Sequence, residues 1–205
     1  MLNDIKKSIN AHRIKLEGKN KITAVLLPLI KKNDELHILF EMRSFNLKSQ
    51  PGEVCLPGGK KEDGELPILS ALRETKEELN LKENQIEIYG GIDTIITPFN
   101  LIIHPFVGCL DIDDIKEIKY SKDEVDHIFT VPLQFFIDNS PAIYYVKNDF
   151  KFSSDFPFRK IPEKENYPWK EGTYSVGFYE YDGYIIWGIT AKIVNNFVNI
   201  IKGLS

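Results

Sequence analysis

Residues 58–81 constrain this chain more than any other stretch, because two glycines precede a segment rich in glutamate. An α-helix turns about 100° per residue, so side chains three or four positions apart share a face. This spacing places Glu74, Glu77 and Glu78 on one face of the predicted helix. The less polar residues fall on the opposite face, namely Ile68, Leu72, Thr75 and Leu79. The sequence therefore predicts a helix with an acidic face and a core face.

Three carboxylates on one face need a compensating interaction, since like charges at i,i+4 destabilise a helix by about 0.2–0.5 kcal/mol per pair. A bound cation supplies it, and oxygen ligands without His or Cys in the segment favour Mg²⁺ or Mn²⁺ over Zn²⁺. Gly58 and Gly59 allow close backbone approaches, and Pro67 suits the first helical turn. This glycine loop favours a metal site over the alternative, a solvated glutamate face.

The same residues resemble the Nudix box of the Nudix hydrolase superfamily. The match consists of Gly59, then Glu65 after five residues, then Arg73-Glu74-Thr75-x-Glu77-Glu78-x-Asn80-Leu81 after seven more. Thr75 stands where an aliphatic residue is usual, and Asn80 stands where the family has glycine. Asn tolerates the left-handed conformation that ends helices, and the methyl group of Thr75 can pack at the edge of the apolar face.

The resemblance implies metal ligands that all present oxygen atoms: the Gly59 carbonyl and the carboxylates of Glu74, Glu77 and Glu78. It gives Arg73 and Glu65 a supporting role, and an ion pair between them would orient the carboxylates. The family hydrolyses nucleoside diphosphates linked to another group. Metal ions would neutralise the diphosphate oxygens and lower the pKa of a bound water, which attacks phosphorus in line.

The general base is left open between two residues, because family members use either a box glutamate or an acid on a later loop. Glu77 is the candidate inside the box. Glu124 is the candidate outside it, and its alternative interpretation is an ordinary exposed loop acid.

The segment before the box, residues 39–59, resembles the signature of coenzyme A pyrophosphatases within the superfamily. The matching residues are Arg43-Ser44, Gly52 and Pro57-Gly58-Gly59. Three positions depart from the signature: Glu41 replaces Thr, Lys48 replaces Arg, and Leu56 replaces Phe. Because coenzyme A carries a diphosphate and a 3′-phosphate, the substrate-binding candidates are the residues that would surround anions: Arg43, Lys48, Gly52 and Gly58.

Lys48 keeps a positive charge but lacks the planar fork with which Arg binds phosphate. The alternative for Arg43 and Lys48 is a pair of surface charges at the end of a strand.

The leading hypothesis is an Mg²⁺- or Mn²⁺-dependent pyrophosphatase that cleaves coenzyme A or its derivatives to 3′,5′-ADP and 4′-phosphopantetheine or its acyl form. One alternative keeps the chemistry but takes ADP-ribose or another nucleoside diphosphate. A second alternative, from another class, is a Nudix-like module that binds nucleotides without cleaving them. The intact set of box carboxylates argues against this module.

Length and composition fit a single soluble enzyme domain, residues 1–205, with 42% hydrophobic and 27% charged residues. The net charge of −4 and the scattered Lys and Arg argue against a nucleic-acid partner. The absence of an apolar signal core or an 18-residue apolar run indicates neither secretion nor a membrane partner, so a cytoplasmic location is expected. A homodimer is left open.

The predicted fold is α/β, a Nudix-type α/β/α sandwich with a mixed sheet. We expect a leader helix near residues 2–16, within a leader at 1–20, and a short helix opened by Pro132. A closing helix is expected from Gly188. Strands are expected near 22–30, 36–43, 85–93, 102–110, 125–131 and 142–147, with a hairpin at Asp182-Gly183. Residues 148–172 are longer than a normal connection, which favours a lid, a mobile surface loop or a dimer contact.

Overall fold

The main sheet of the computed structural model is mixed, and its strands follow the order β3-β2-β1-β7-β5. The model describes residues 1–13, 16–112, 114–148 and 151–204. The strands of this sheet are β1 (Lys21–Lys32), β2 (Glu35–Arg43), β3 (Val54–Cys55), β4 (Gly58–Lys60), β5 (Ile86–Gly91), β6 (Ile95–Ile96), β7 (Leu101–Leu110) and β8 (Val125–Pro132). Strands β4, β6 and β8 pair with β1, β7 and β2 respectively, and β1 runs parallel to β7.

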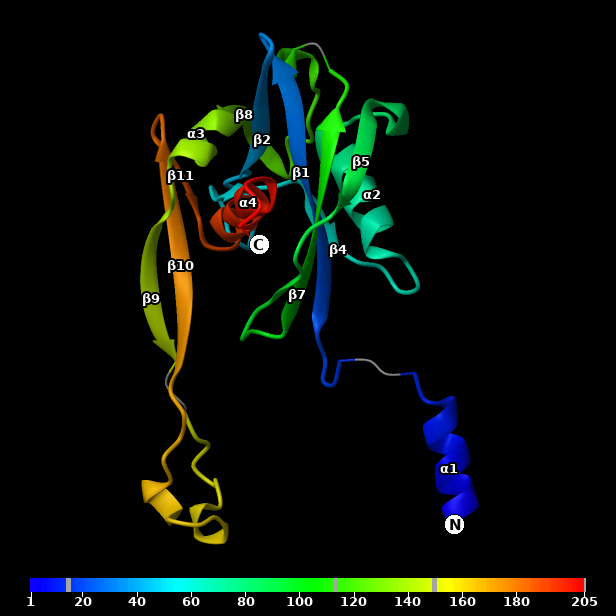
Figure 1. The fold of residues 1–205 in the computed structure, drawn as a ribbon, viewed down its shortest axis with the longest axis vertical. Helices are drawn as coiled ribbons and strands as arrows, with labels where there is room; N and C mark the ends of the chain where they lie inside the picture. Colours follow the sequence, from blue (N-terminus) through cyan, green and yellow to red (C-terminus); the bar gives the residue numbers. More distant parts are fainter. Residues whose placement is uncertain (14–15, 113, 149–150, 205) are drawn as a thin grey trace.

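Two helices cover the two faces of this sheet, which gives the predicted α/β/α arrangement (Figure 1). Helix α2 (Pro67–Leu79) lies on one face, and α4 (Gly188–Ile201) lies on the other. Side chains alternate along each strand, so neighbouring residues enter different cores. Leu27 and Leu29 of β1 pack in the α4 core, whereas Leu26 packs in the α2 core.

A second sheet of three strands, which the sequence analysis did not separate from the first, has the order β11-β10-β9. Its strands are β9 (Ala142–Asn148), β10 (Gly172–Tyr181) and β11 (Tyr184–Trp187). The predicted hairpin is confirmed, because Tyr181 pairs with Tyr184, and Asp182 and Gly183 both have positive φ. The short helix α3 (Leu133–Asp138) begins after Pro132, as predicted.

The N-terminal helix and the described part of the segment between β9 and β10 lie outside the two-core body (Figure 1). Helix α1 (Leu2–Ala11) is shorter than the predicted 2–16 and buries none of its residues; residues 14–15 lie outside the described residues. Of the 148–172 segment, residues 149–150 lie outside the described residues, and the remainder extends beyond β9 and β10, away from α2 (Figure 1). The lid and the division into leader and domain stay predictions.

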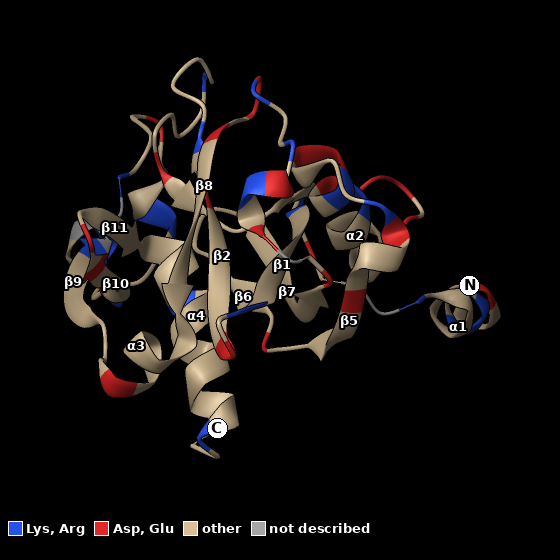
Figure 2. Cartoon of the chain, turned by 90° about the horizontal axis from the view of Figure 1, so that it is seen from above, with Lys and Arg blue, Asp and Glu red and all other residues tan. Residues whose placement is uncertain are grey.

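Charged residues are frequent along α2 and in the loops around the sheet (Figure 2). Along α2, Lys and Arg are interspersed with Glu. Within the described residues, no helix is long and apolar enough to cross a membrane.

Candidate active site

The glycine loop packs too closely for side chains, as the sequence predicts. Strand β4 pairs with β1, with Gly58 opposite Val25 and Gly59 opposite Ala24. Gly58 has φ +147°, and a Cβ there would collide with the Ala24 carbonyl oxygen. A Cβ on Gly59 would collide with the carboxyl group of Glu74. Glycine at position 58 therefore lets the loop pack against β1, and glycine at position 59 lets it lie against Glu74 of the acidic helix.

Arg73 joins several acids of the box. Its Nε lies 3.1 Å from Glu65 Oε1, so the expected pair is formed. Its Nη1 lies 2.9 Å from Glu74 Oε1 and 3.4 Å from Glu77 Oε2. The backbone N–H of Glu62 also donates to Glu65, at 3.0 Å. Arg73 therefore positions these carboxylates and offsets part of their negative charge.

Glu78 differs from the expectation of an acidic face opposite the core. Only 6% of the residue is exposed, because it lies on the buried side of α2 with Thr75 and Leu79. The backbone N–H of Gly58 donates to Glu78 Oε2 at 2.7 Å, which partly compensates the burial. Burial raises the pKa of Glu78 to about 8, and the charges of Glu124 and Glu74 act in the same direction. The box carboxylates are thus split between a buried and an exposed environment.

Of the two departures from the box pattern, Asn80 has the predicted role, whereas Thr75 lies deeper than the predicted edge of the apolar face. Thr75 is buried, and its hydroxyl donates to the Ala71 carbonyl at 2.7 Å. Asn80 ends α2 in the left-handed conformation, with φ 49° and ψ 45°. Neither residue disturbs the helix.

Glu124 lies beside the box although it is distant from it in sequence. The backbone N–H of Ser121 donates to the Glu78 carbonyl at 2.7 Å, and that of Ser44 donates to the Glu124 carbonyl at 2.8 Å. The charge of Glu124 raises the pKa values of both Glu74 and Glu78, although burial is the largest cause for each. Glu77 instead has a side chain that is 61% exposed and contacts Arg73.

Glu41 is a residue whose importance the sequence analysis missed. It was noted only as a departure from the coenzyme A signature, yet it is 1% exposed in the middle of the sheet. Burial, followed by the charge of Glu78, raises the pKa of Glu41 well above its usual value. The available signal was a single acid within an otherwise apolar strand, Leu39-Phe40-Glu41-Met42.

A pocket of about 190 Å³ opens beside the glycine loop. Arg43, Gly58 and Gly59 line it, together with apolar residues of β7 and α4 such as Ile103 and Ile193. Arg43 Nε is buried and has no hydrogen-bond partner among the described residues, so a donor is available for an anion.

Lys48 and Gly52 lie on the loop next to this pocket rather than in its lining. Lys48 is exposed, whereas Gly52 (φ +69°) forms a turn in which its N–H donates to the Arg43 carbonyl at 3.1 Å. Gly52 therefore shapes the backbone that carries Arg43. The structure brings Arg43 and Gly58 together but leaves Lys48 toward solvent.

The residues of the box fit a hard divalent cation chemically, although the described part of the chain contains no ready-made cluster of three metal-ligating side chains. The side chains of Glu74 and Glu77 contact Arg73, and that of Glu78 accepts from the Gly58 N–H. Their donors are carboxylate oxygens, which suit Mg²⁺ or Mn²⁺. Burial raises the pKa of the neighbouring Cys55 thiol well above its usual value, so no thiolate competes for a softer metal.

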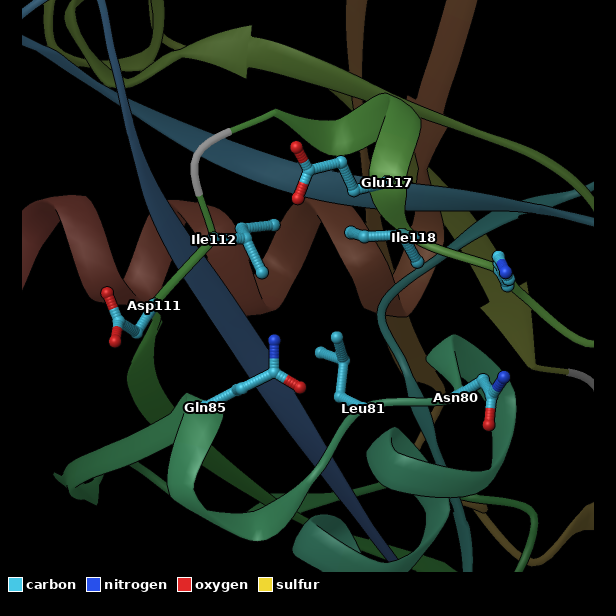
Figure 3. A pocket seen from close by; sticks show the side chains of 8 residues that line it. Asn80, Leu81, Gln85, Asp111, Ile112, Glu117 and Ile118 are labelled. Atoms are coloured by element: carbon cyan, nitrogen blue, oxygen red, sulfur yellow. The ribbon is translucent and has the colours of Figure 1, made fainter.

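A separate pocket, of about 310 Å³, lies at the carboxyl end of α2 (Figure 3). Its lining includes Asn80, Gln85, Asp111 and Glu117, and none of the box carboxylates. The lining of the pocket beside Gly58 and Gly59 also lacks the box carboxylates, but it contains both glycines of the box, and Gly59 packs directly against the carboxyl group of Glu74.

The fold, the glycine loop and the acidic helix define a class of protein. The NUDIX domain model matches residues 20–150, so the chain belongs to the Nudix family of hydrolases. These enzymes act on phosphoanhydride bonds of small nucleotides and generally use divalent metal ions.

Two individual relatives indicate the subfamily to which this chain is similar. A peroxisomal coenzyme A diphosphatase of Mus musculus is 35% identical over 134 residues, which cover 65% of this chain and 55% of that protein. The match thus spans about half the length of the mouse relative. A peroxisomal coenzyme A diphosphatase of Caenorhabditis elegans is 29% identical over 164 residues, covering 78% of this chain and 69% of that protein. The resemblance to this subfamily is confirmed.

Among solved structures, a MutT/nudix family protein from Enterococcus faecalis has a TM-score of 0.51 and 13% identity. The match covers 98% of this chain and 70% of that chain. It supports the α/β fold with its mixed sheet.

Proposed function

We propose that this protein is an Mg²⁺- or Mn²⁺-dependent diphosphatase that cleaves coenzyme A or its derivatives to 3′,5′-ADP and 4′-phosphopantetheine or its acyl form. The observation that carries the proposal is the pocket beside the box, where the unpartnered Nε of Arg43 lies with Gly58 and Gly59. The named activity of the mouse and worm relatives supports the same substrate. A cytoplasmic location and a single domain spanning residues 1–205 remain part of the proposal.

The residues that would hold the metal ions are the Gly59 carbonyl, Glu74, Glu77 and Glu78. When bound, the ions would neutralise the diphosphate oxygens and lower the pKa of water. Glu74 and Glu77 would then exchange their contacts with Arg73 for the metal ions, and Arg73 would keep its ion pair with Glu65. Arg43 would bind a phosphate oxygen through its free Nε–H.

Glu124 is the better candidate for the general base. A base must receive a proton without losing its place as a metal ligand, and Glu124 lies outside the box. Its charge reaches Glu74 and Glu78, so it is close to the reacting position. Glu77 is directed to Arg73 and is needed as a ligand.

Product analysis tests the proposed reaction. The purified protein is incubated with coenzyme A and with ADP-ribose, each in Mg²⁺ or Mn²⁺, alongside a Glu78→Gln control. Release of 3′,5′-ADP that disappears in the control is the expected result. Turnover of ADP-ribose but not of coenzyme A would support metal-dependent diphosphate hydrolysis and would contradict coenzyme A as the substrate. Tight nucleotide binding without any turnover would instead indicate a binding module.

Lys48→Ala is expected to raise KM for coenzyme A about tenfold more than KM for 3′-dephospho-coenzyme A, because an exposed Lys48 would reach the 3′-phosphate. Steady-state kinetics with both substrates measures this ratio. Lys119→Ala, on the pocket at the other end of α2, is the control and leaves the ratio unchanged. Equal increases in KM for the two substrates would show that Lys48 does not contact the 3′-phosphate.

A further inference from the structure

Glu41 lies on the face of the main sheet that α2 covers. On β2, Ile38 and Phe40 pack in the core beneath α4, whereas Leu39 packs in the core beneath α2. Because side chains alternate along a strand, Glu41 shares the face of Leu39. It therefore faces the box helix and not the opposite core.

The strands on both sides of β2 enclose Glu41. Cys55 of β3 pairs with it on one side, and Ile128 of β8 pairs with it on the other. The Cys55 thiol donates to Glu41 Oε2 at 3.8 Å. The other oxygen, Oε1, is buried and has no hydrogen-bond partner among the described residues. A buried carboxyl oxygen without a partner is unfavourable, so this position is suited to a ligand.

The surroundings of Glu41 are unbalanced in charge. Glu78 and Glu124 both act electrostatically on it, and Arg43 is the cation that partly offsets them. Glu78 is itself 6% exposed and is held by the Gly58 N–H. Buried carboxylates that interact electrostatically repel unless a proton or a cation offsets their charge. A divalent cation at the box would therefore interact with Glu41 as well as with Glu78.

We propose that Glu41 is an additional carboxylate ligand of the divalent cation at the Nudix box, with Oε1 as its donor atom. The proposal rests on the metal dependence proposed above. Glu41 stands where the coenzyme A signature has Thr, so this ligand is a feature of the present chain. Its added negative charge would strengthen binding of a hard cation such as Mg²⁺ or Mn²⁺.

Mn²⁺ binding tests this assignment independently of turnover. Metal-free wild-type protein and Glu41→Gln are titrated with Mn²⁺, and free Mn²⁺ is followed by electron paramagnetic resonance. Gln keeps the size of the side chain and removes its charge. Glu41→Gln is expected to bind Mn²⁺ about 10–100-fold more weakly than the wild type. Glu35→Gln, at the exposed start of the same strand, is the matched control and keeps wild-type affinity.

Two further measurements make the result decisive. Glu78→Gln shows how strongly the box itself contributes, and unfolding of each metal-free variant shows whether the fold is intact. If Glu41→Gln does not fold, Glu41→Thr, which carries the residue usual in the signature, replaces it in the titration. Unchanged Mn²⁺ affinity in a folded Glu41 variant, together with weakened binding in Glu78→Gln, would overturn the assignment of Glu41 as a ligand. It would leave the proposed metal dependence intact. A wild type that binds no Mn²⁺ would overturn both the assignment and the proposed metal dependence.

Discussion

Glu124→Gln is expected to lower kcat for diphosphate hydrolysis by about 10²–10⁴-fold, because the amide cannot accept a proton from the attacking water. Mn²⁺ affinity should fall less than in Glu77→Gln, because Glu124 is not a proposed ligand and acts on Glu74 and Glu78 only through its charge. Single-turnover kinetics, combined with Mn²⁺ titration, separates these two effects.

Glu77→Gln is the informative comparison. Because Glu77 is a proposed metal ligand, Glu77→Gln should mainly weaken Mn²⁺ binding. Part of the activity of this variant should return at high Mn²⁺ concentration. Asp123→Asn, in the same exposed loop as Glu124, is the matched control and should retain kcat. Equal, mild losses for Glu77→Gln and Glu124→Gln would refute the assignment of the base.

The metal-free protein is expected to lose stability as the pH rises from about 5 to about 8, by an amount on the order of a few kcal/mol. The pKa of Glu78 is about 8 in the folded protein, compared with an ordinary value of 4.5. Between these values the folded state retains a proton that the unfolded state has released. The stabilisation is therefore complete below the unfolded pKa and is lost as the pH passes through the folded one. Glu41, whose pKa burial also raises, acts in the same direction.

Chemical denaturation in the presence of a chelator, repeated from pH 5 to pH 8, measures this slope. Glu78→Gln should flatten it, whereas Glu87→Gln, an exposed acid on β5, should leave it unchanged. Added Mg²⁺ or Mn²⁺ should stabilise the protein more at pH 8 than at pH 5, because the ion replaces the protons of the buried acids. A stability that rises with pH in the wild type, and equally in Glu78→Gln, would contradict the burial argument.

Local features of the site were predictable because they depend on short stretches of chain. The spacing of Glu74, Glu77 and Glu78 and the close approach at Gly58 and Gly59 follow from helix geometry or from the absence of a side chain. The pairing of Arg73 with Glu65, which lies before α2, was instead implied by the resemblance to the Nudix box. Asn80 adopts its left-handed conformation for a similarly local reason. Most strands and both core helices follow from their hydrophobic periodicity.

The electrostatic organisation of the site was not predictable in this way. Glu78 is buried because of the way α2 is rotated against the sheet. The sequence shows only that Glu78 follows Glu77, and this spacing does not reveal the rotation of the helix. Glu41 faces the box because β2 places its odd-numbered residues beneath α2. Glu124 reaches the same place because β8 pairs with β2, far from it in sequence.

The sequence by itself thus determined both core helices, most of the longer strands, the glycine loop and the identity of the box acids, since each depends on neighbours a few residues away. Only the tertiary structure decided which acids share a buried space, and that Arg43 rather than Lys48 lines the pocket. The physical reason is that charge interactions act through space. Their strength is set by strand pairing and by burial, which only the complete fold determines.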